Sequence, residues 1–297
     1  MDAFISHSSK NTALAAQIEK CLEQDALNVW LDRSEIRLGV LLRNELQVAI
    51  QNSRVLILLW SRPAANSRWV AAELLSAFHL NRFIIPCVLD NTQLPYFLQP
   101  TVYLDLRRQR AKRIEGLGRT VREAPNAAND VRPIMSSQSP EVSRAIHMLA
   151  TAQRAVLTQL QQRNPGKAQE IQNLADDVMK HALQAWVMDQ TILNLAGYHC
   201  KNAYMIKHWD AIQAGVSLKD PLLQDAERFF FRTLFINPKD YSALNGLGSI
   251  LIMEQELDAA EFFIQRAIAL AEQDQVDYIE AKQDLAMITR YKQKPRS

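Results

Sequence analysis

Trp69 and Glu73 are the two side chains whose types and spacing most clearly allow chemistry. They stand four residues apart in a segment with helical periodicity, so both lie on one face of the predicted helix 67–80. This helix follows the apolar strand Val55–Trp60, and ligands of parallel sheets bind outside the carboxyl ends of the strands. A carboxylate in such a crevice can stabilise positive charge that develops on a bound substrate.

Both residues could instead have a purely structural role, without taking part in chemistry. On spacing alone, a glutamate near the start of a helix more often interacts with the helix dipole, and an indole on a helix is more often part of the core. Glu73 nevertheless lies well past Asn66 and Ser67, the candidate N-caps, which is too deep for a capping box. The two interpretations also apply to Trp60 and Ser61, at the end of the preceding strand.

Strand-like and helical segments alternate from Asp2 to about Ala124. The expected strands are residues 3–6, 28–31, 55–60, 83–89 and 102–104, and helical spacing marks residues 14–22, 42–50, 67–80 and 114–121. This alternation predicts an α/β fold with a parallel sheet covered by helices on both faces. Five strands fit a flavodoxin-like order.

The strand signal ends with the α/β region. Residues 125–140 are polar and contain several prolines, so they are the expected linker between a domain at 1–124 and an all-α domain at 141–297. Within 207–293, apolar and small residues recur at the spacing of a tetratricopeptide (TPR) helix pair. These residues are Leu244, Leu247, Gly248, Leu251, Ala260, Ile264 and Ala267. The TPR-like match is partial, because Glu272 replaces the closing proline, and an irregular helical bundle is the alternative.

The composition describes a soluble globular protein. Of 297 residues, 48% are hydrophobic and 22% charged, and the net charge of +2 gives no bias toward nucleic acid. Three widely spaced cysteines fit neither a disulfide framework nor a zinc site, which favours a reducing cytoplasm. The longest apolar run, Val55–Trp60, is too short to cross a bilayer, and no signal peptide precedes the first strand. We expect no membrane contact.

Several other kinds of site lack their motifs. With only 8 Gly, the chain has no glycine-rich phosphate loop, and its six scattered His form no metal-ligand cluster. Residues 107–132 hold eight Lys or Arg against three acidic residues. The solvated face of a helix is the favoured interpretation of this run, and docking of an acidic partner or a nucleotide is the alternative. The interleaved aromatics that single-stranded nucleic acid requires are missing.

The first 124 residues resemble a TIR domain. The resemblance rests on the opening strand with Phe4-Ile5-Ser6-His7-Ser8, on Leu31–Gly39, which looks like the BB loop, on the central strand with Ser61, and on Trp69-x-x-x-Glu73. The cysteine usual near the start of the third helix is absent. The resemblance implies an enzyme in which Glu73 is the essential glutamate: an NAD+ nucleosidase or ADP-ribosyl cyclase. NAD would be its substrate, and no cofactor or metal is expected.

The same resemblance implies further site residues and partners. The expected substrate-binding residues are Phe4, Ser6, Asp32, Arg33, Arg37, Ser61 and Trp69. In NAD-cleaving relatives the BB loop gates the pocket and packs against the next TIR subunit, although its charges here fit a solvated loop equally well. Self-association is therefore expected. The resemblance to prokaryotic TIR effectors also implies antiphage defence, with the helical half sensing a protein or nucleotide trigger or driving oligomerisation.

Two alternatives compete with this interpretation. A non-enzymatic signalling scaffold would join the TIR domain to a TPR-like peptide-binding array. An enzyme resembling nucleoside deoxyribosyltransferases, which are related in fold, would also place a glutamate at a ribose. The TIR-like BB loop argues against the latter.

Overall fold

The structure is a computed structural model that describes residues 1–31, 48–125 and 139–293. It divides into two compact units, Met1–Arg132 and Pro133–Ser297. The last helix of the first unit ends at Glu123, and the first helix of the second begins at Pro140. The domain bounds 1–124 and 141–297 stay predictions.

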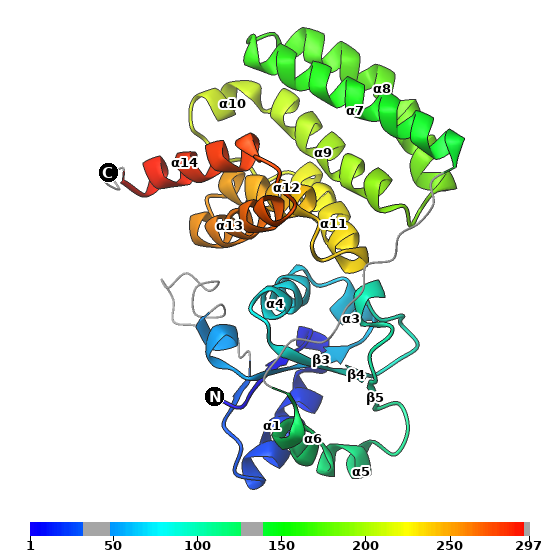
Figure 1. The fold of residues 1–297 in the computed structure, drawn as a ribbon, viewed down its shortest axis with the longest axis vertical. Coiled ribbons are helices and arrows are strands. Elements are labelled where there is room, and N and C mark those ends of the chain that lie inside the picture. The colour runs from blue at the N-terminus through cyan, green and yellow to red at the C-terminus, as the bar shows by residue number, and fades with distance from the viewer. Residues whose placement is uncertain (32–47, 126–138, 294–297) are drawn as a thin grey trace. The chain divides into compact units, whose positions relative to one another are not determined.

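The first unit contains a five-stranded parallel sheet (Figure 1). Its strands are β1 (Ala3–Ser6), β2 (Val29–Leu31), β3 (Val55–Trp60), β4 (Phe83–Val88) and β5 (Leu104–Asp105). The spatial order is β2-β1-β3-β4-β5, which confirms the flavodoxin-like prediction. The order reverses between β1 and β3, so the topological switch point lies at the carboxyl ends of these two strands.

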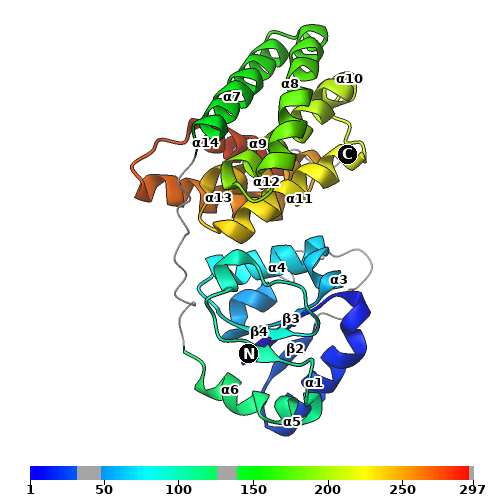
Figure 2. The same cartoon turned by 90° about the vertical axis from the view of Figure 1, so that its right-hand side faces the viewer.

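Helices cover both faces of this sheet (Figures 1 and 2). On one face, Ala3 and Ile5 of β1 share a core with residues of three helices. These helices are α1 (Thr12–Gln24), α5 (Arg110–Glu115) and α6 (Leu117–Glu123). Helix α4 (Arg68–His79) contacts β1, β3 and β4 on the other face. Because side chains alternate along a strand, Phe4 and Ser6 belong to the face that α4 covers.

The last strand, β5, at one edge of the sheet, differs from the strand predicted at residues 102–104. The last strand pairs with β4 only at Leu104 and Asp105, and Val102, predicted to lie in it, is 93% exposed. Such a short edge strand limits unwanted pairing with other chains. The single closing helix predicted from Ile114, Leu117 and Val121 is two helices that meet at Gly116, a residue with low helix propensity.

The described part of the second unit is helical, as predicted. Its helices are α7 (Pro140–Gln161), α8 (Pro165–Ala185), α9 (Gln190–Lys207), α10 (Trp209–Gln213), α11 (Pro221–Ile236), α12 (Tyr241–Met253), α13 (Leu257–Gln273) and α14 (Ile279–Gln293). Many of these helices begin with an N-cap residue whose side chain accepts a backbone hydrogen bond. Ser139, Asn164 and Asp220 each accept a backbone hydrogen bond and are followed by proline in the first turn. None of the described helices is both long and apolar enough to span a bilayer.

Small residues allow these helices to pack closely. The fully buried ring of Phe230 in α11 lies against Gly197 of α9 and Gly246 of α12, where an added Cβ would clash with it. The apolar set that predicted a TPR-like pair falls on α12 and α13 and is buried. That these helices form a TPR-like array stays a prediction.

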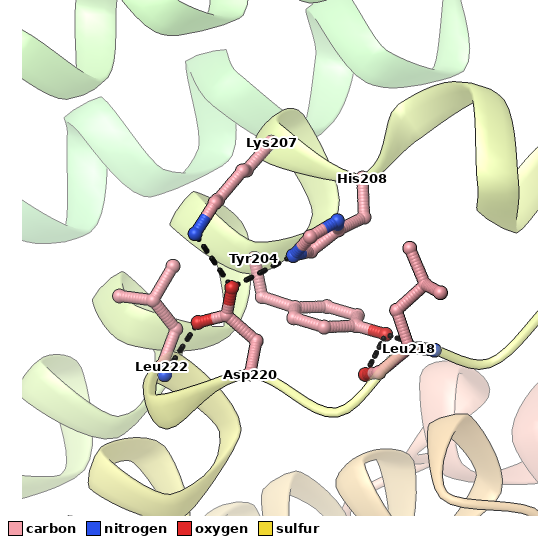
Figure 3. A network of polar contacts seen from close by, with 6 residues as sticks. All are labelled: Tyr204, Lys207, His208, Leu218, Asp220 and Leu222. Atoms are coloured by element: carbon pink, nitrogen blue, oxygen red, sulfur yellow. Dashed lines mark hydrogen bonds and ion pairs between the residues drawn. The ribbon is translucent and has the colours of Figure 1, made fainter.

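A buried aspartate joins the end of α9 to the start of α11 (Figure 3). Asp220 lies 2.6 Å from Lys207 Nζ and 2.8 Å from His208 Nε2, and it accepts the Leu222 amide at 2.9 Å. Beside it, the Tyr204 hydroxyl donates to the Leu218 carbonyl at 2.9 Å. The Lys207 ammonium, the Leu222 amide and His208 hold the pKa of Asp220 well below its ordinary value.

Candidate active site

Glu73 is a buried residue in the second turn of α4, with only 3% of its surface exposed. The helix begins after Ser67, whose hydroxyl accepts the Val70 amide at 3.4 Å, so one of the two candidate caps is confirmed. The apolar side chains of this helix are buried as well: Val70, Ala71, Leu74, Leu75 and Phe78. Burying a carboxylate is costly unless it is paired or hydrogen-bonded, and buried carboxylates occur often at functional sites.

The start of α4 lies at the edge of the sheet where the strands end. The chain reaches this edge at Trp60, forms the short helix α3 (Arg62–Ala65) and then enters α4. Glu73 follows Arg68 by five positions, which places it roughly 7.5 Å along the helix axis from that residue. Its backbone therefore stays near the carboxyl ends of the strands, where ligands of parallel sheets bind.

Ser6 and Phe4 lie on the face of the sheet that α4 covers. Both are completely buried. The ring of Phe4 stacks on Trp30 of β2, with centroids 4.9 Å apart. The Ser6 hydroxyl, at the end of β1, makes no hydrogen bond within the described part of the chain. Buried hydroxyls without a protein partner are uncommon.

Ser61 links the two strand ends at the switch point. Its hydroxyl donates to Asn11 Oδ1 at 2.8 Å and caps α3 by accepting the Ala64 amide at 3.3 Å. Asn11 ends the short 3₁₀ helix η1 (Ser9–Asn11) that follows β1. The contact therefore ties the loop after β3 to the loop after β1. Asn11 was not predicted, although its place just after the first strand is a signal that could have identified it.

The two tryptophans near the switch point differ. Trp60 is 2% exposed and its indole donates to the Gln93 carbonyl at 2.8 Å, so it fixes the loop after β4. Trp69 is half-buried and precedes Glu73 by one helical turn. Of the two, only Trp69 combines an accessible surface with a place beside the buried carboxylate.

Three predicted site residues, Asp32, Arg33 and Arg37, lie outside the described residues. Two further polar residues, His7 and Ser8, are buried just after β1. The hydroxyl of Ser8 accepts the Lys10 amide at 3.4 Å and caps η1. The described residues thus bring together Ser6, Ser61 and the start of α4 at one edge of the sheet.

This arrangement supplies one carboxylate, several hydroxyls and an indole at a sheet edge. Within the described ranges, no group of His, Cys, Asp and Glu could hold a metal ion. The carboxylate can stabilise a cation or orient hydroxyl groups, and the hydroxyls can donate hydrogen bonds to a polar ligand.

Comparison with known proteins gives the first unit a family. The model of the TIR domain family matches residues 3–121. Among solved structures, the chain is similar to the TIR domain of the Toll-related receptor TRR-2 from Hydra magnipapillata, at 20% identity, with a TM-score of 0.37. The similarity covers 41% of this chain and 98% of that one. No curated protein matches the chain. Residues 3–121 are therefore a TIR domain, which a helical region follows.

Proposed function

We propose that this TIR domain cleaves NAD, as an NAD+ nucleosidase or an ADP-ribosyl cyclase. The observation that carries the proposal is Glu73, a carboxylate 3% exposed in the second turn of α4. Its place near the switch point is where a parallel sheet binds its ligand. A TIR domain that serves only to dock other proteins does not need a buried carboxylate at this position.

One carboxylate suffices for this reaction. The bond between the ribose carbon and the nicotinamide nitrogen breaks, and its electron pair goes to the nitrogen, so nicotinamide leaves as a neutral molecule. The remaining ribosyl cation is stabilised by the carboxylate of Glu73. Water captures the cation and releases a proton to give ADP-ribose, or an atom of the adenine or ribose captures it to give a cyclic isomer.

The other site residues bind and orient the substrate in this proposal. Trp69 flanks the nicotinamide ribose, and the hydroxyls of Ser6 and Ser61 bond to ribose or diphosphate oxygens, with Phe4 supporting the strand that carries Ser6. Asp32, Arg33 and Arg37 contact the substrate or a neighbouring TIR domain. These roles follow from the resemblance to NAD-cleaving TIR domains and from the grouping of strand ends described above.

The helical region regulates the enzyme in this proposal. TIR domains self-associate, so a region that senses a protein or nucleotide trigger, or drives assembly, controls activity through the local concentration of TIR domains. NAD loss or a nucleotide signal in the cytoplasm is then the output in antiphage defence.

Incubation with NAD tests the proposal directly. The full chain at high concentration should release nicotinamide, and mass spectrometry should identify ADP-ribose or a cyclic isomer. Glu73→Gln and Glu73→Ala should lower the rate of product formation at least about 100-fold. Glu23→Gln, which changes an exposed glutamate of α1, should not. Equal product from all variants rejects the proposal, and absence of product from every variant at all concentrations favours the scaffold alternative.

A further inference from the structure

Two adjoining hollows lie at the carboxyl ends of β4 and β5, away from Glu73 in the chain. The first has a volume of about 510 Å³ and is lined by Asn91, Asp105, Arg107, Arg108 and Arg113. The second, of about 280 Å³, shares Asn91 and Arg107 with the first and includes Leu94, Gln99 and Tyr103. Together they reach the size range of pockets that bind small molecules.

The wall between the hollows is held by a network of hydrogen bonds. Arg107 donates through Nε and Nη2 to the two carboxylate oxygens of Asp105, each at 2.9 Å, and through Nη1 to Asn91 Oδ1 at 2.8 Å. The Arg107 amide also donates to Asp105 at 3.0 Å. The paired Asp105 neutralises Arg107, and this bidentate geometry fixes the guanidinium in place.

Two further arginines line the first hollow, and Arg113 lies close enough to Asp105 to help Arg107 lower the pKa of that carboxyl. Among the described residues, neither Arg108 nor Arg113 forms an ion pair within 4.0 Å. Their guanidinium groups can each offer paired N–H donors to phosphate oxygens. The first hollow therefore carries an excess of two positive charges, which suits an anion with more than one negative charge, such as a diphosphate.

The second hollow offers different chemistry. Tyr103 is 44% exposed and provides a ring face, and Gln99 donates to the Leu94 carbonyl at 3.1 Å. Asp90 fixes the adjoining loop by accepting the Thr92 and Arg62 amides, each at 2.8 Å. An aromatic ring beside amide groups on a fixed loop suits a planar heterocyclic base.

We propose that these hollows form a binding site for a nucleoside diphosphate. The diphosphate contacts Arg108 and Arg113, and the base lies against Tyr103. None of the residues that line the hollows belongs to the switch-point group of Ser6, Ser61 and Glu73. The proposal does not depend on NAD cleavage, and it gives the basic run after β5 a role other than a solvated helix face.

Titration calorimetry with ADP at fixed salt tests this site on the full chain. ADP should bind, and the double variant Arg108→Gln/Arg113→Gln should weaken binding at least about tenfold, because it removes both charged contacts. Arg119→Gln is the matched control: this arginine belongs to the same run, is 82% exposed and pairs only with Glu123 in the described structure. It should change the affinity less than about twofold.

A second variant separates the two hollows. Tyr103→Ala should weaken ADP binding about fivefold or more through lost stacking and leave the binding of inorganic pyrophosphate unchanged. The proposal is overturned if ADP does not bind, or if Arg119→Gln weakens it as much as the double variant does. It is also overturned if Glu73→Gln abolishes ADP binding and the arginine variant has no effect, since the nucleotide then occupies the switch point.

Discussion

The two units of this chain distribute their buried polar side chains differently. In the TIR domain, Ser6, His7, Ser8 and Ser61 are buried where β1 and β3 end, and Glu73 is buried on the helix that starts at the same edge, while Glu19, Ser53, Ser76 and His79 are buried elsewhere. In the helical region, buried polar residues such as Gln172, Lys201, Thr233 and Asn245 are spread over four helices. A parallel sheet ends all its strands at one edge, so it collects polar groups there, whereas helices disperse them along their faces.

Hydrogen bonding also differs between particular buried residues of the two units, although Asn202 of the helical region, like Ser6, makes no side-chain hydrogen bond with the described residues. In the helical region, Asp220 joins two helices, and Ser249 of α12 donates to Asp284 of α14 at 2.7 Å. In the TIR domain, the Ser6 hydroxyl forms no hydrogen bond with the described residues. The comparison of Asp220 and Ser249 with Ser6 predicts that substitutions of the first two cost stability, and that substitution of Ser6 costs activity instead.

The largest expected loss of stability comes from Asp220. Asp220→Ala removes a helix cap and charge-assisted hydrogen bonds, so the free energy of unfolding should fall by about 2–3 kcal/mol. Asp220→Asn keeps a capping side chain and should cost less. Thermal or denaturant unfolding measures both. The control, Asp225→Ala, breaks an exposed pair with Arg228 and should cost less than about 1 kcal/mol. Equal losses would contradict a structural role for Asp220.

The Asp220 network also predicts a dependence on pH. Lys207, Leu222 and His208 lower the pKa of this carboxylate in the folded protein, so it stabilises the fold fully above its unfolded pKa of about 4. This contribution is lost as the pH falls further toward the folded pKa. The stability difference between the protein and Asp220→Asn should therefore shrink below about pH 4. A constant difference between pH 7 and pH 3 would refute this account.

A smaller effect should distinguish two buried serines, one in each unit. Ser249→Ala loses its bond to Asp284 and should lower the free energy of unfolding by about 1 kcal/mol. Ser6→Ala should leave it unchanged or raise it slightly, because a buried hydroxyl that forms no bond with the described residues is removed. The same Ser6→Ala change should raise KM for NAD. An equal loss of stability in Ser6→Ala and Ser249→Ala would contradict the prediction that the two serines differ in their contribution to the fold.

Some of this structure follows from local sequence. The six apolar residues Val55–Trp60 fit only a strand buried on both faces, and Ser67 followed by an apolar stripe defines the start and the inner face of α4. These two elements place Glu73 on the helix that starts near the switch point, whereas the expectation that it serves a site comes from the resemblance to TIR domains and not from its spacing.

Other features depend on contacts between distant residues. The last strand forms only where Leu104 pairs with Cys87, so the apolar residue Val102 gave a wrong start for the predicted strand. The basic run gives no sign that Arg108 and Arg113 line one hollow, because that depends on Asn91 after β4. Asp220 and Lys207 are 13 positions apart in different elements, and only the packing of α9 and α11 brings them together.

The kinetic constants of Glu73→Gln for NAD test the central claim most directly. A carboxylate that stabilises the ribosyl cation acts in the transition state, so kcat should fall at least about 100-fold while KM stays within about threefold. Unchanged unfolding of the variant would show that the fold is intact. A kcat equal to that of the unaltered protein would contradict the account, because the buried carboxylate would then take no part in cleavage.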